Sequence, residues 1–195
     1  MMLKTAISLA ATLGLTFFVG ITGVCARTLD GLSIPESVRL RVDGPELALR
    51  GAYVRRYFFF RTTAYAFYSQ EQAQTFDQLI ASTSPKRMVV TIMMSRFTAD
   101  QFRRGWMEQF SESLSPEQLK TLDPQIQAFL DTFETLQQHE QLAFDFVPSE
   151  GVAISLRGTR KRVIQSDEFA NALLSAWLGP RGVDHGLVQA VFGAK

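Results

Sequence analysis

The sequence predicts an α+β fold in which helices cover one face of a largely antiparallel sheet, and three observations support this. Along the chain, the predicted elements come in the order strands, helices, strands and helices. Turn signals separate neighbouring strand-like segments, and short turns favour antiparallel hairpins over parallel crossovers. The 195 residues, 46% of them hydrophobic, contain no repeat and no internal linker. We therefore expect one domain that is large enough to bury a core.

The first 26 residues are expected to be a secretory signal peptide, with residues 27–195 as the single mature domain. Residues 6–24 carry no charge and follow a positive start, and Val24-Cys25-Ala26 offers the small residues that a signal peptidase requires. Cleavage after Ala26 predicts export to the bacterial periplasm. The alternative is an uncleaved membrane anchor, because the apolar run is nearly long enough to span a bilayer. No later segment reaches that length without a charge, so we expect no transmembrane segment after cleavage.

The start of the mature chain is predicted to consist of strands. Residues 38–42 alternate apolar and charged side chains, Asp43-Gly44-Pro45 is a turn signal, and residues 47–54 form the next strand. Residues 57–68 are mostly aromatic or β-branched, which predicts one long strand. These segments together should make the first part of the sheet.

The middle of the chain changes from strand to helix. Residues 71–82 are compatible with a helix that ends before Ser84-Pro85, and the apolar run 88–94 predicts a strand buried on both faces. Thr98 is placed to cap the next helix. Its predicted buried stripe is Ala99, Phe102, Trp106, Phe110 and Leu114.

Two shorter helices and a second group of strands should follow. Ser115-Pro116 begins one helix, and Asp123 caps another that has Pro124 in its first turn. The buried stripe predicted for that helix is Ile126, Phe129, Leu130, Phe133 and Leu136. Residues 142–146 and 152–156 then alternate as a hairpin, and residues 161–165 form a third strand.

The chain is predicted to end in two helices. Ser166 caps a helix that places Phe169, Leu173 and Trp177 inward and stops at Gly179-Pro180. Residues 186–192 form a final short helix.

Composition excludes several classes of function. There are 20 Lys and Arg against 19 Asp and Glu, a net charge of +1 that argues against nucleic-acid binding. One cysteine and two histidines leave little material for a metal centre, and there is no Gly-rich phosphate loop, so we expect no cofactor. His139, at a polar helix end, and His185, in a loop, should both be exposed.

The unusual segment is residues 50–68, where arginines alternate with aromatic residues. An arginine that points inward from a strand would need an anion or a carboxylate, because burial of an unpaired guanidinium is costly. An apolar cavity with one arginine at its end suits a fatty acid or an acidic polyphenol. The alternative is that all of these arginines are surface cations whose stems pack on aromatic rings.

Four motifs resemble the bacterial chalcone isomerase-like family. They are LRGAYVR at residues 49–55, FFFR at 58–61, PKR at 85–87 and FANALLSAWLG at 169–179, and the resemblance covers about residues 30 to 193. It implies an open-faced sandwich, a curved antiparallel sheet covered by a helical layer with a ligand cleft between them. The family includes plant enzymes that cyclise chalcones and non-catalytic relatives that bind fatty acids.

The resemblance also implies site residues. Arg55 matches the arginine that holds the anionic ligand, and Thr63 matches a threonine on the following strand. Phe102 stands where the plant enzymes have a catalytic tyrosine, and Gln109 stands near their asparagine. Tyr53 replaces the second glycine of the first motif, close to the cleft mouth. Loss of polar groups beside a retained arginine fits binding better than catalysis.

We therefore expect an exported, non-catalytic protein that binds a fatty acid or a similar amphipathic anion. The expected ligand-binding residues are Arg55, Thr63, Tyr68, Phe102, Trp106, Gln109 and Trp177. For Phe102, Trp106 and Trp177 the alternative is a purely structural role in the core. Two other functions stay open: an isomerase of chalcone isomerase type with an unknown substrate, and a structural or partner-binding protein whose cleft is filled by side chains.

Overall fold

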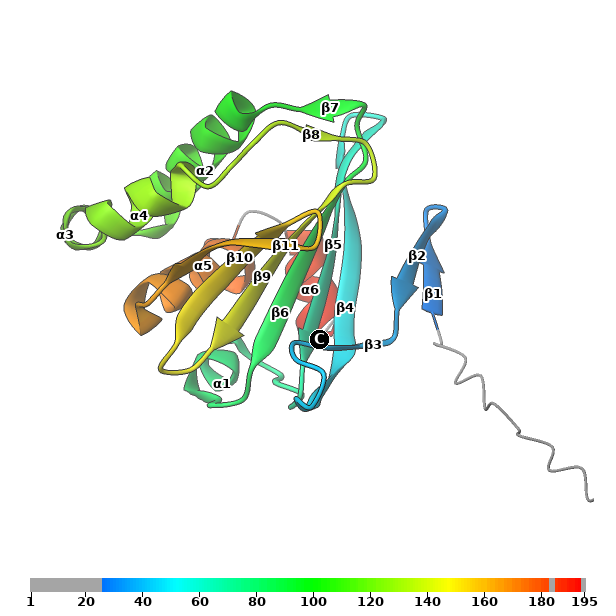
Figure 1. The fold of residues 1–195 in the computed structure, drawn as a ribbon, viewed down its shortest axis with the longest axis horizontal. Coiled ribbons are helices and arrows are strands. Elements are labelled where there is room, and N and C mark those ends of the chain that lie inside the picture. The colour runs from blue at the N-terminus through cyan, green and yellow to red at the C-terminus, as the bar shows by residue number, and fades with distance from the viewer. Residues whose placement is uncertain (1–25, 183–184, 194–195) are drawn as a thin grey trace, which may run out of the picture.

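A curled, seven-stranded antiparallel sheet forms the centre of the protein in a computed structural model that describes residues 26–182 and 185–193 (Figure 1). The strand order is β11-β10-β9-β6-β5-β4-β3. The bounds are β3 (Ser37–Arg39), β4 (Glu46–Tyr57), β5 (Phe60–Ser69), β6 (Lys86–Ile92), β9 (Gln141–Val147), β10 (Gly151–Leu156) and β11 (Thr159–Ile164). Two small pairs stand apart from it, β1 (Ala26–Leu29) with β2 (Leu32–Pro35), and β7 (Arg96–Phe97) with β8 (Leu136–Gln137).

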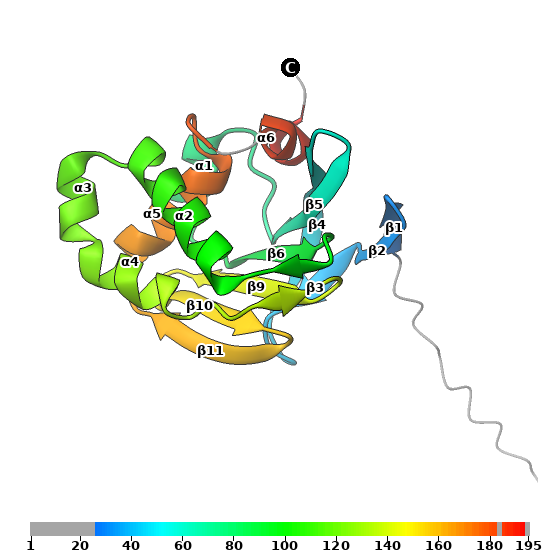
Figure 2. The same cartoon turned by 90° about the horizontal axis from the view of Figure 1, so that it is seen from above.

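The helices lie on the concave side of the sheet, as Figure 2 shows from above. They are α1 (Phe76–Ala81), α2 (Ala99–Ser113), α3 (Pro116–Thr121), α4 (Asp123–Leu130), α5 (Asp167–Leu178) and α6 (His185–Phe192). The main core fills the space between the two layers, where apolar side chains of β5, β6, β9 and β10 meet those of α2, α4 and α5. The predicted α+β class, with an antiparallel sheet and a helical layer, is confirmed. The predicted signal peptide lies almost wholly outside the described residues.

The predicted helix starts at Thr98, Ser115 and Ser166 are confirmed. Thr98 and Ser115 each form a capping box. The hydroxyl of the cap residue accepts a hydrogen bond from the backbone N–H of a glutamine three residues later, and the side chain of that glutamine accepts one from the backbone N–H of the cap residue. Ser166 accepts a hydrogen bond from the backbone N–H of Phe169. Polar residues that compete with the helix interior therefore mark these boundaries correctly.

The largest departure from prediction is in residues 57–68, which form no single strand. The chain leaves β4 at Tyr57, turns through Phe58 and Phe59, and returns in β5 from Phe60. Phe58 has a φ of 53°, in the left-handed region that favours glycine or asparagine. No residue of this turn belongs to the types that normally signal one, so strand propensity alone was misleading.

Other predicted boundaries were also wrong. The strand predicted over 38–42 ends at Arg39, where a turn closes with Gly44 N–H donating to Arg41 O at 3.0 Å. The helix predicted over 71–82 begins only at Phe76, capped by Thr75. His185 opens α6 and does not lie in a loop, although it is exposed, as is His139 in the turn before β9.

The helix that follows α3 also differs from its prediction. Asp123 is its first residue and not its cap, because Leu122 occupies the cap position without a side-chain bond. The buried stripe continues past the helix: α4 ends at Leu130, and Leu136 belongs to β8. The helical spacing of apolar residues therefore continues beyond the end of α4, into the segment that leads to β8.

Gly51 allows α6 to pack directly on β4. A Cβ at this position would lie 2.4 Å from the backbone oxygen of Ala190, closer than real atoms approach. The glycine of the LRGAYVR motif is therefore required by this contact between strand and helix.

The PKR motif serves the sheet. Arg87 donates to both carboxylate oxygens of Asp145, at 2.5 and 2.8 Å, across the β6–β9 pair. Lys86 is 4% exposed, and its Nζ donates to the carbonyls of Ser82 and Ser84 at 2.9 and 3.0 Å. Burial lowers the pKa of Lys86. These two cations fasten β6 to its neighbour strand and to the preceding loop.

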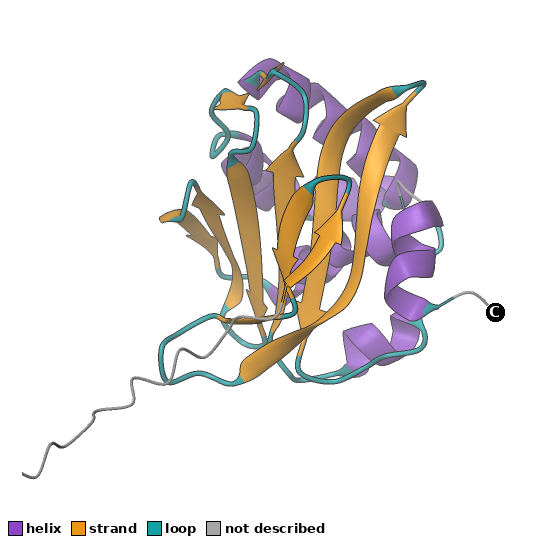
Figure 3. Cartoon of the chain, turned by 90° about the vertical axis from the view of Figure 1, so that its right-hand side faces the viewer, coloured by secondary structure: helices purple, strands orange, loops and turns teal. Residues whose placement is uncertain are grey.

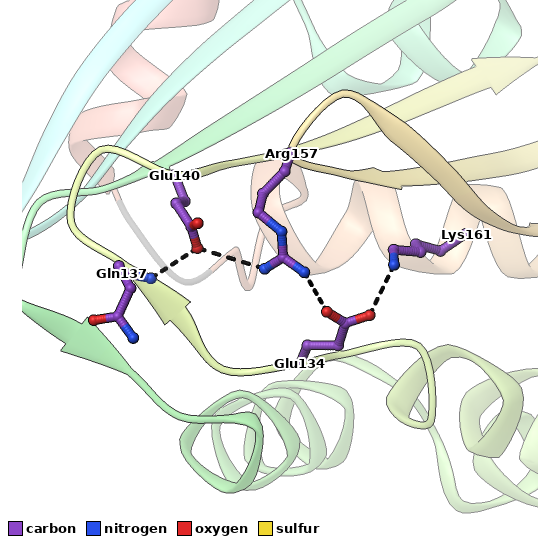
Figure 4. A network of polar contacts seen from close by, with 5 residues as sticks. All are labelled: Glu134, Gln137, Glu140, Arg157 and Lys161. Carbon is purple, nitrogen blue, oxygen red and sulfur yellow. Dashed lines mark hydrogen bonds and ion pairs between the residues drawn. The ribbon is translucent and has the colours of Figure 1, made fainter.

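A polar network connects the segment after α4 to the β10–β11 hairpin (Figure 4). Glu134 accepts from Arg157 and, at 2.9 Å, from Lys161. Arg157 also pairs with Glu140 at 3.5 Å, and Glu140 accepts from the backbone N–H of Gln137 at 2.9 Å. The hydrogen bonds from Lys161 and Arg157 lower the pKa of Glu134.

We predict that Glu134→Gln loosens this connection without unfolding the domain, because the network is at the surface. Amide hydrogen exchange of residues 131–140 should become faster than in the wild type at neutral pH. A carboxyl whose pKa is lowered by folding stabilises above its unfolded pKa and loses this effect as the pH falls through its folded pKa. The difference should therefore disappear in acid. Glu112→Gln, on the exposed face of α2, is the matched control; equal exchange in both variants would contradict the prediction.

Candidate functional site

A cavity of about 100 Å³ lies between the concave face of the sheet and the helices α2 and α5. The sheet contributes Arg55, Thr63, Tyr65, Val90, Leu142 and Phe144. The β7–α2 segment and α5 contribute Phe97, Gln101, Phe102, Gly105, Trp106, Gln109 and Trp177. Six of the seven predicted ligand-binding residues line this one space, and Tyr68 is the exception.

Arg55 and Thr63 are brought together by strand pairing. They are direct cross-strand partners in the β4–β5 hairpin, so both side chains point to the same face of the sheet. The register shifts just beyond them, between Arg55 and Arg56, and the Thr62 hydroxyl donates to the Arg55 carbonyl at 3.2 Å. Such a bulge re-aims neighbouring side chains. Arg55 is solvent-exposed at the cavity edge, whereas Thr63 is 6% exposed.

The hydroxyl of Thr63 is buried and has no hydrogen-bond partner. Among the buried side-chain polar atoms of the described residues, this is true of only one other, Gln125 Oε1. An unsatisfied buried hydroxyl typically costs about 1–3 kcal/mol. This atom is therefore ready to bond a polar group that enters the cavity. It lies next to the cation that would hold the same group.

Tyr68 does not line the cavity, which corrects the prediction. It lies on the convex face of the sheet, where its hydroxyl donates to the Pro35 carbonyl at 3.1 Å and its ring packs with Leu47 and Ala66. Burial raises the pKa of its phenol to about 12. Side chains alternate along a strand, so a tyrosine five residues after Thr63 must face away from it.

Tyr65 is the tyrosine that sequence reasoning missed. It is two residues after Thr63, shares its face, is 8% exposed and lines the cavity. The same alternation would have identified it from the sequence once Thr63 was chosen. Two residues of β5, Thr63 and Tyr65, thus line the cavity beside the arginine from β4.

The predicted aromatic residues are both cavity wall and core. The ring of Phe102 stacks on Phe133 with centroids 4.9 Å apart and contacts Phe97 at 4.1 Å. Trp106 meets Trp177 edge to face at 4.9 Å. These rings belong to or pack against the main core cluster, so the structural role and the lining role coexist. They make much of the helix side of the cavity aromatic.

Two glutamines of α2 also reach the cavity. Gln109 is 5% exposed, and its Nε2 donates to the carbonyl of Ala176 at 3.1 Å, which fastens α2 to α5. Gln101 accepts from the backbone N–H of Thr98 at 2.8 Å within the capping box. Both amides therefore have structural partners, and neither is poised like the Thr63 hydroxyl.

Tyr53 packs away from the cavity, against α6. A Cβ at Gly186 would lie 2.2 Å from Tyr53 Cε2, so the glycine leaves the space that the ring fills. Tyr53 is not among the lining residues. The large side chain in the first motif is thus accommodated by a small residue on the facing helix.

Few ionisable side chains line the cavity. Arg55 and Tyr65 are the ionisable lining residues that the structure describes, and none of the other described lining residues is an aspartate, glutamate, histidine or lysine. Over residues 26–182 and 185–193, no three His, Cys, Asp or Glu side chains gather as a metal site. In the same ranges no helix is long and apolar enough to cross a membrane.

Comparison with known proteins gives a family and a fold. A family model described as chalcone isomerase-like matches residues 26–193. The crystal structure of a fatty-acid binding protein from Arabidopsis thaliana is similar to this chain, with a TM-score of 0.66 and 13% sequence identity. The similarity covers 84% of this chain and 92% of the plant protein. No curated protein sequence matches.

We predict that Thr63→Val does not destabilise the protein, and raises its free energy of unfolding by up to about 1 kcal/mol. The substitution replaces an unsatisfied hydroxyl with a methyl group of the same size. Urea unfolding of the ligand-free protein measures this. Thr91→Val is the control, because that buried hydroxyl accepts from Gln141 at 3.2 Å and its loss should destabilise. A Thr63 variant as destabilised as the control would show that its hydroxyl is satisfied.

We predict that alkali weakens the wild type more than Tyr68→Phe. A phenol whose pKa rises from 10 to about 12 on folding gives stability that is present below pH 10 and lost as the pH rises to 12. Two pKa units correspond to about 3 kcal/mol. Urea unfolding at pH 9 and pH 11.5 should show a steeper loss for the wild type. An equal loss of unfolding free energy in the two proteins would contradict the prediction and indicate that the phenol is exposed to solvent.

Proposed function

Because this chain belongs to the chalcone isomerase-like family, we propose that it binds a fatty acid or a similar amphipathic anion in the cavity under α2 and α5. The observation that carries the proposal is the unsatisfied hydroxyl of Thr63, buried in an apolar-walled cavity beside its cross-strand partner Arg55. A carboxylate is the group that would satisfy both. It accepts hydrogen bonds from a hydroxyl and pairs with a guanidinium.

The rest of the cavity matches the other end of such a ligand. Phe97, Phe102, Trp106 and Trp177 present aromatic surface, and Val90 and Leu142 present aliphatic surface. An acyl chain gains free energy by leaving water for this surface, at about 0.8 kcal/mol for each methylene group. The cavity therefore has a cationic end for the carboxylate and apolar walls for the acyl chain.

The volume limits how a ligand can enter. Pockets that enclose a whole drug-sized ligand usually measure about 300–1,000 Å³. The 100 Å³ seen here accommodates the head group and the first carbons of a chain. A longer chain needs Phe102 or Trp106 to move, and both are on α2, the outer wall of the cavity.

Catalysis receives less support from the same residues. Phe102 has no hydroxyl at the position of the tyrosine that the plant enzymes use, and its ring is held between Phe97 and Phe133. General acid–base catalysis needs a group of suitable pKa at the reacting atom. The fatty-acid-binding function of the structurally similar plant protein also favours a ligand carrier. We include in the proposal that residues 1–26 are a signal peptide and that the carrier acts in the periplasm.

The test is mass spectrometry of small molecules extracted from the protein purified from its native compartment, for the wild type and for Arg55→Gln. We expect a stoichiometric acidic lipid in the wild type and little in the variant. A titration with a fluorescent fatty-acid analogue should show affinity reduced about 10-fold or more in Arg55→Gln, because a charge-assisted hydrogen bond is lost.

Arg56→Gln is the matched control, since Arg56 pairs with Asp30 and does not line the cavity. It should bind like the wild type. An empty wild type that also fails to bind the analogue would overturn the proposal. Turnover of a chalcone by the wild type would replace it with the isomerase function.

A further inference from the structure

The turn between β4 and β5 exposes a cluster of aromatic side chains. The exposed fractions are 69% for Tyr57, 77% for Phe58, 94% for Phe59 and 76% for Phe60. Elsewhere in the described residues the large exposed apolar side chains are single and scattered: Val42, Met107 and Val163. We call residues 57–60 the aromatic tip. Isolated apolar residues at a surface are ordinary, but a contiguous group of this kind marks an interaction site.

The aromatic tip is not explained by the needs of the turn. A two-residue hairpin turn favours glycine, asparagine or aspartate, and Phe58 adopts a φ of 53° that costs an aromatic residue about 1–2 kcal/mol. The aromatic rings also gain little from the fold, because they are mostly in water. Residues that oppose both local conformation and burial indicate a function at that place.

The tip projects beyond the sheet. The last pair between β5 and its neighbour β6 is Thr63 with Ile92, so residues 57–62 extend past the end of that strand. Figure 3 shows the β4–β5 hairpin rising to its turn at the upper right of the molecule. A surface that approaches from this end meets the aromatic rings of the tip directly.

Positive charge surrounds the tip. Arg55, Arg56 and Arg61 flank it, and the sequence has no acidic residue between Glu46 and Glu71. Asp30, from the β1–β2 turn, pairs with Arg56 at 2.5 Å, and its carbonyl accepts from Arg61 at 2.7 Å. For Arg56 and Arg61, one carboxylate, that of Asp30, stands against two guanidinium groups, which leaves the base of the tip cationic.

We infer that the aromatic tip inserts into the interfacial region of a lipid bilayer that contains anionic lipids. Aromatic rings favour the depth of the head groups, and arginines beside them attract acidic phosphates. A bilayer takes up a narrow, convex projection because it has no fixed shape of its own. A protein partner would need a groove matched to the tip. Arg55 lies on the edge of the cavity as well, so docking would bring the cavity close to the membrane surface.

The experiment measures binding of the whole protein to vesicles of phosphatidylcholine, with and without phosphatidylglycerol, by co-sedimentation. We expect binding to the anionic vesicles that weakens in high salt. Phe58→Gly combined with Phe59→Asn should reduce the partition coefficient at least about 10-fold, since two rings no longer leave water. The same double variant should unfold at an equal or higher temperature, because it relieves the backbone at residue 58.

Val42→Ser is the matched control, because Val42 is a highly exposed apolar residue that precedes β4, whereas the tip follows the other end of this strand, and the variant should bind vesicles like the wild type. The inference is overturned if the wild type does not bind anionic vesicles, or if the double variant binds them as well as the wild type. It is also overturned if the tip instead mediates a dimer, seen as a concentration-dependent mass that the double variant abolishes. None of these outcomes depends on whether the cavity carries a fatty acid.

Discussion

The alternation of side chains along β5 is the constraint on which the rest of the structure depends. This strand is near the middle of the sheet and buried on both faces, so each residue must suit one of two different environments. Thr63, Tyr65 and Phe67 face the helices, and Ala64, Ala66 and Tyr68 face the convex side. A shift of one residue would exchange these sets and turn Thr63 and Tyr65 away from the cavity. The bulge beside Arg55 lies in the pairing of β5 with β4, and the ion pair between Arg87 and Asp145 links the neighbouring strands β6 and β9.

The same helical layer has to close the core and leave room for a ligand. Phe102, Trp106 and Trp177 do both, since their rings contact other core aromatics and also bound the cavity. Packing of this density resists small changes, because a side chain that moves loses contacts on every side. The amide of Gln109, bonded to the end of α5, adds a polar connection between the two helices. Any widening of the cavity therefore involves α2 as a unit.

Sequence reasoning recovered the fold class, the caps at Thr98, Ser115 and Ser166, and the β9–β10 hairpin because these depend on local rules. Hydrophobic period, polar cap residues and turn signals act over a few positions, and the residues that carry them are plain in the chain. Family resemblance added Arg55 and Thr63. The errors arose where the sequence carried no local signal, or where the face of a strand on which a side chain lies had to be predicted. The Phe58-Phe59 turn has no turn residue, and Tyr68 was predicted as a hydroxyl partner although it faces the side of β5 opposite to Thr63. The volume of the cavity and the contact of α6 with Gly51 depend on long-range packing that no local pattern encodes.

The close approach of α6 to Gly51 has a consequence for how the protein is made. The strand β4 precedes most of the described elements along the chain, and α6 follows the others. Ala190 is 139 residues from the glycine it contacts, so this pairing closes a very long loop. A growing chain cannot place α6 on β4 until Ala190 has been synthesised. Contacts of such long range slow folding and leave apolar surface uncovered for longer. The side of β4 that α6 covers therefore stays open while the intervening strands and helices are made.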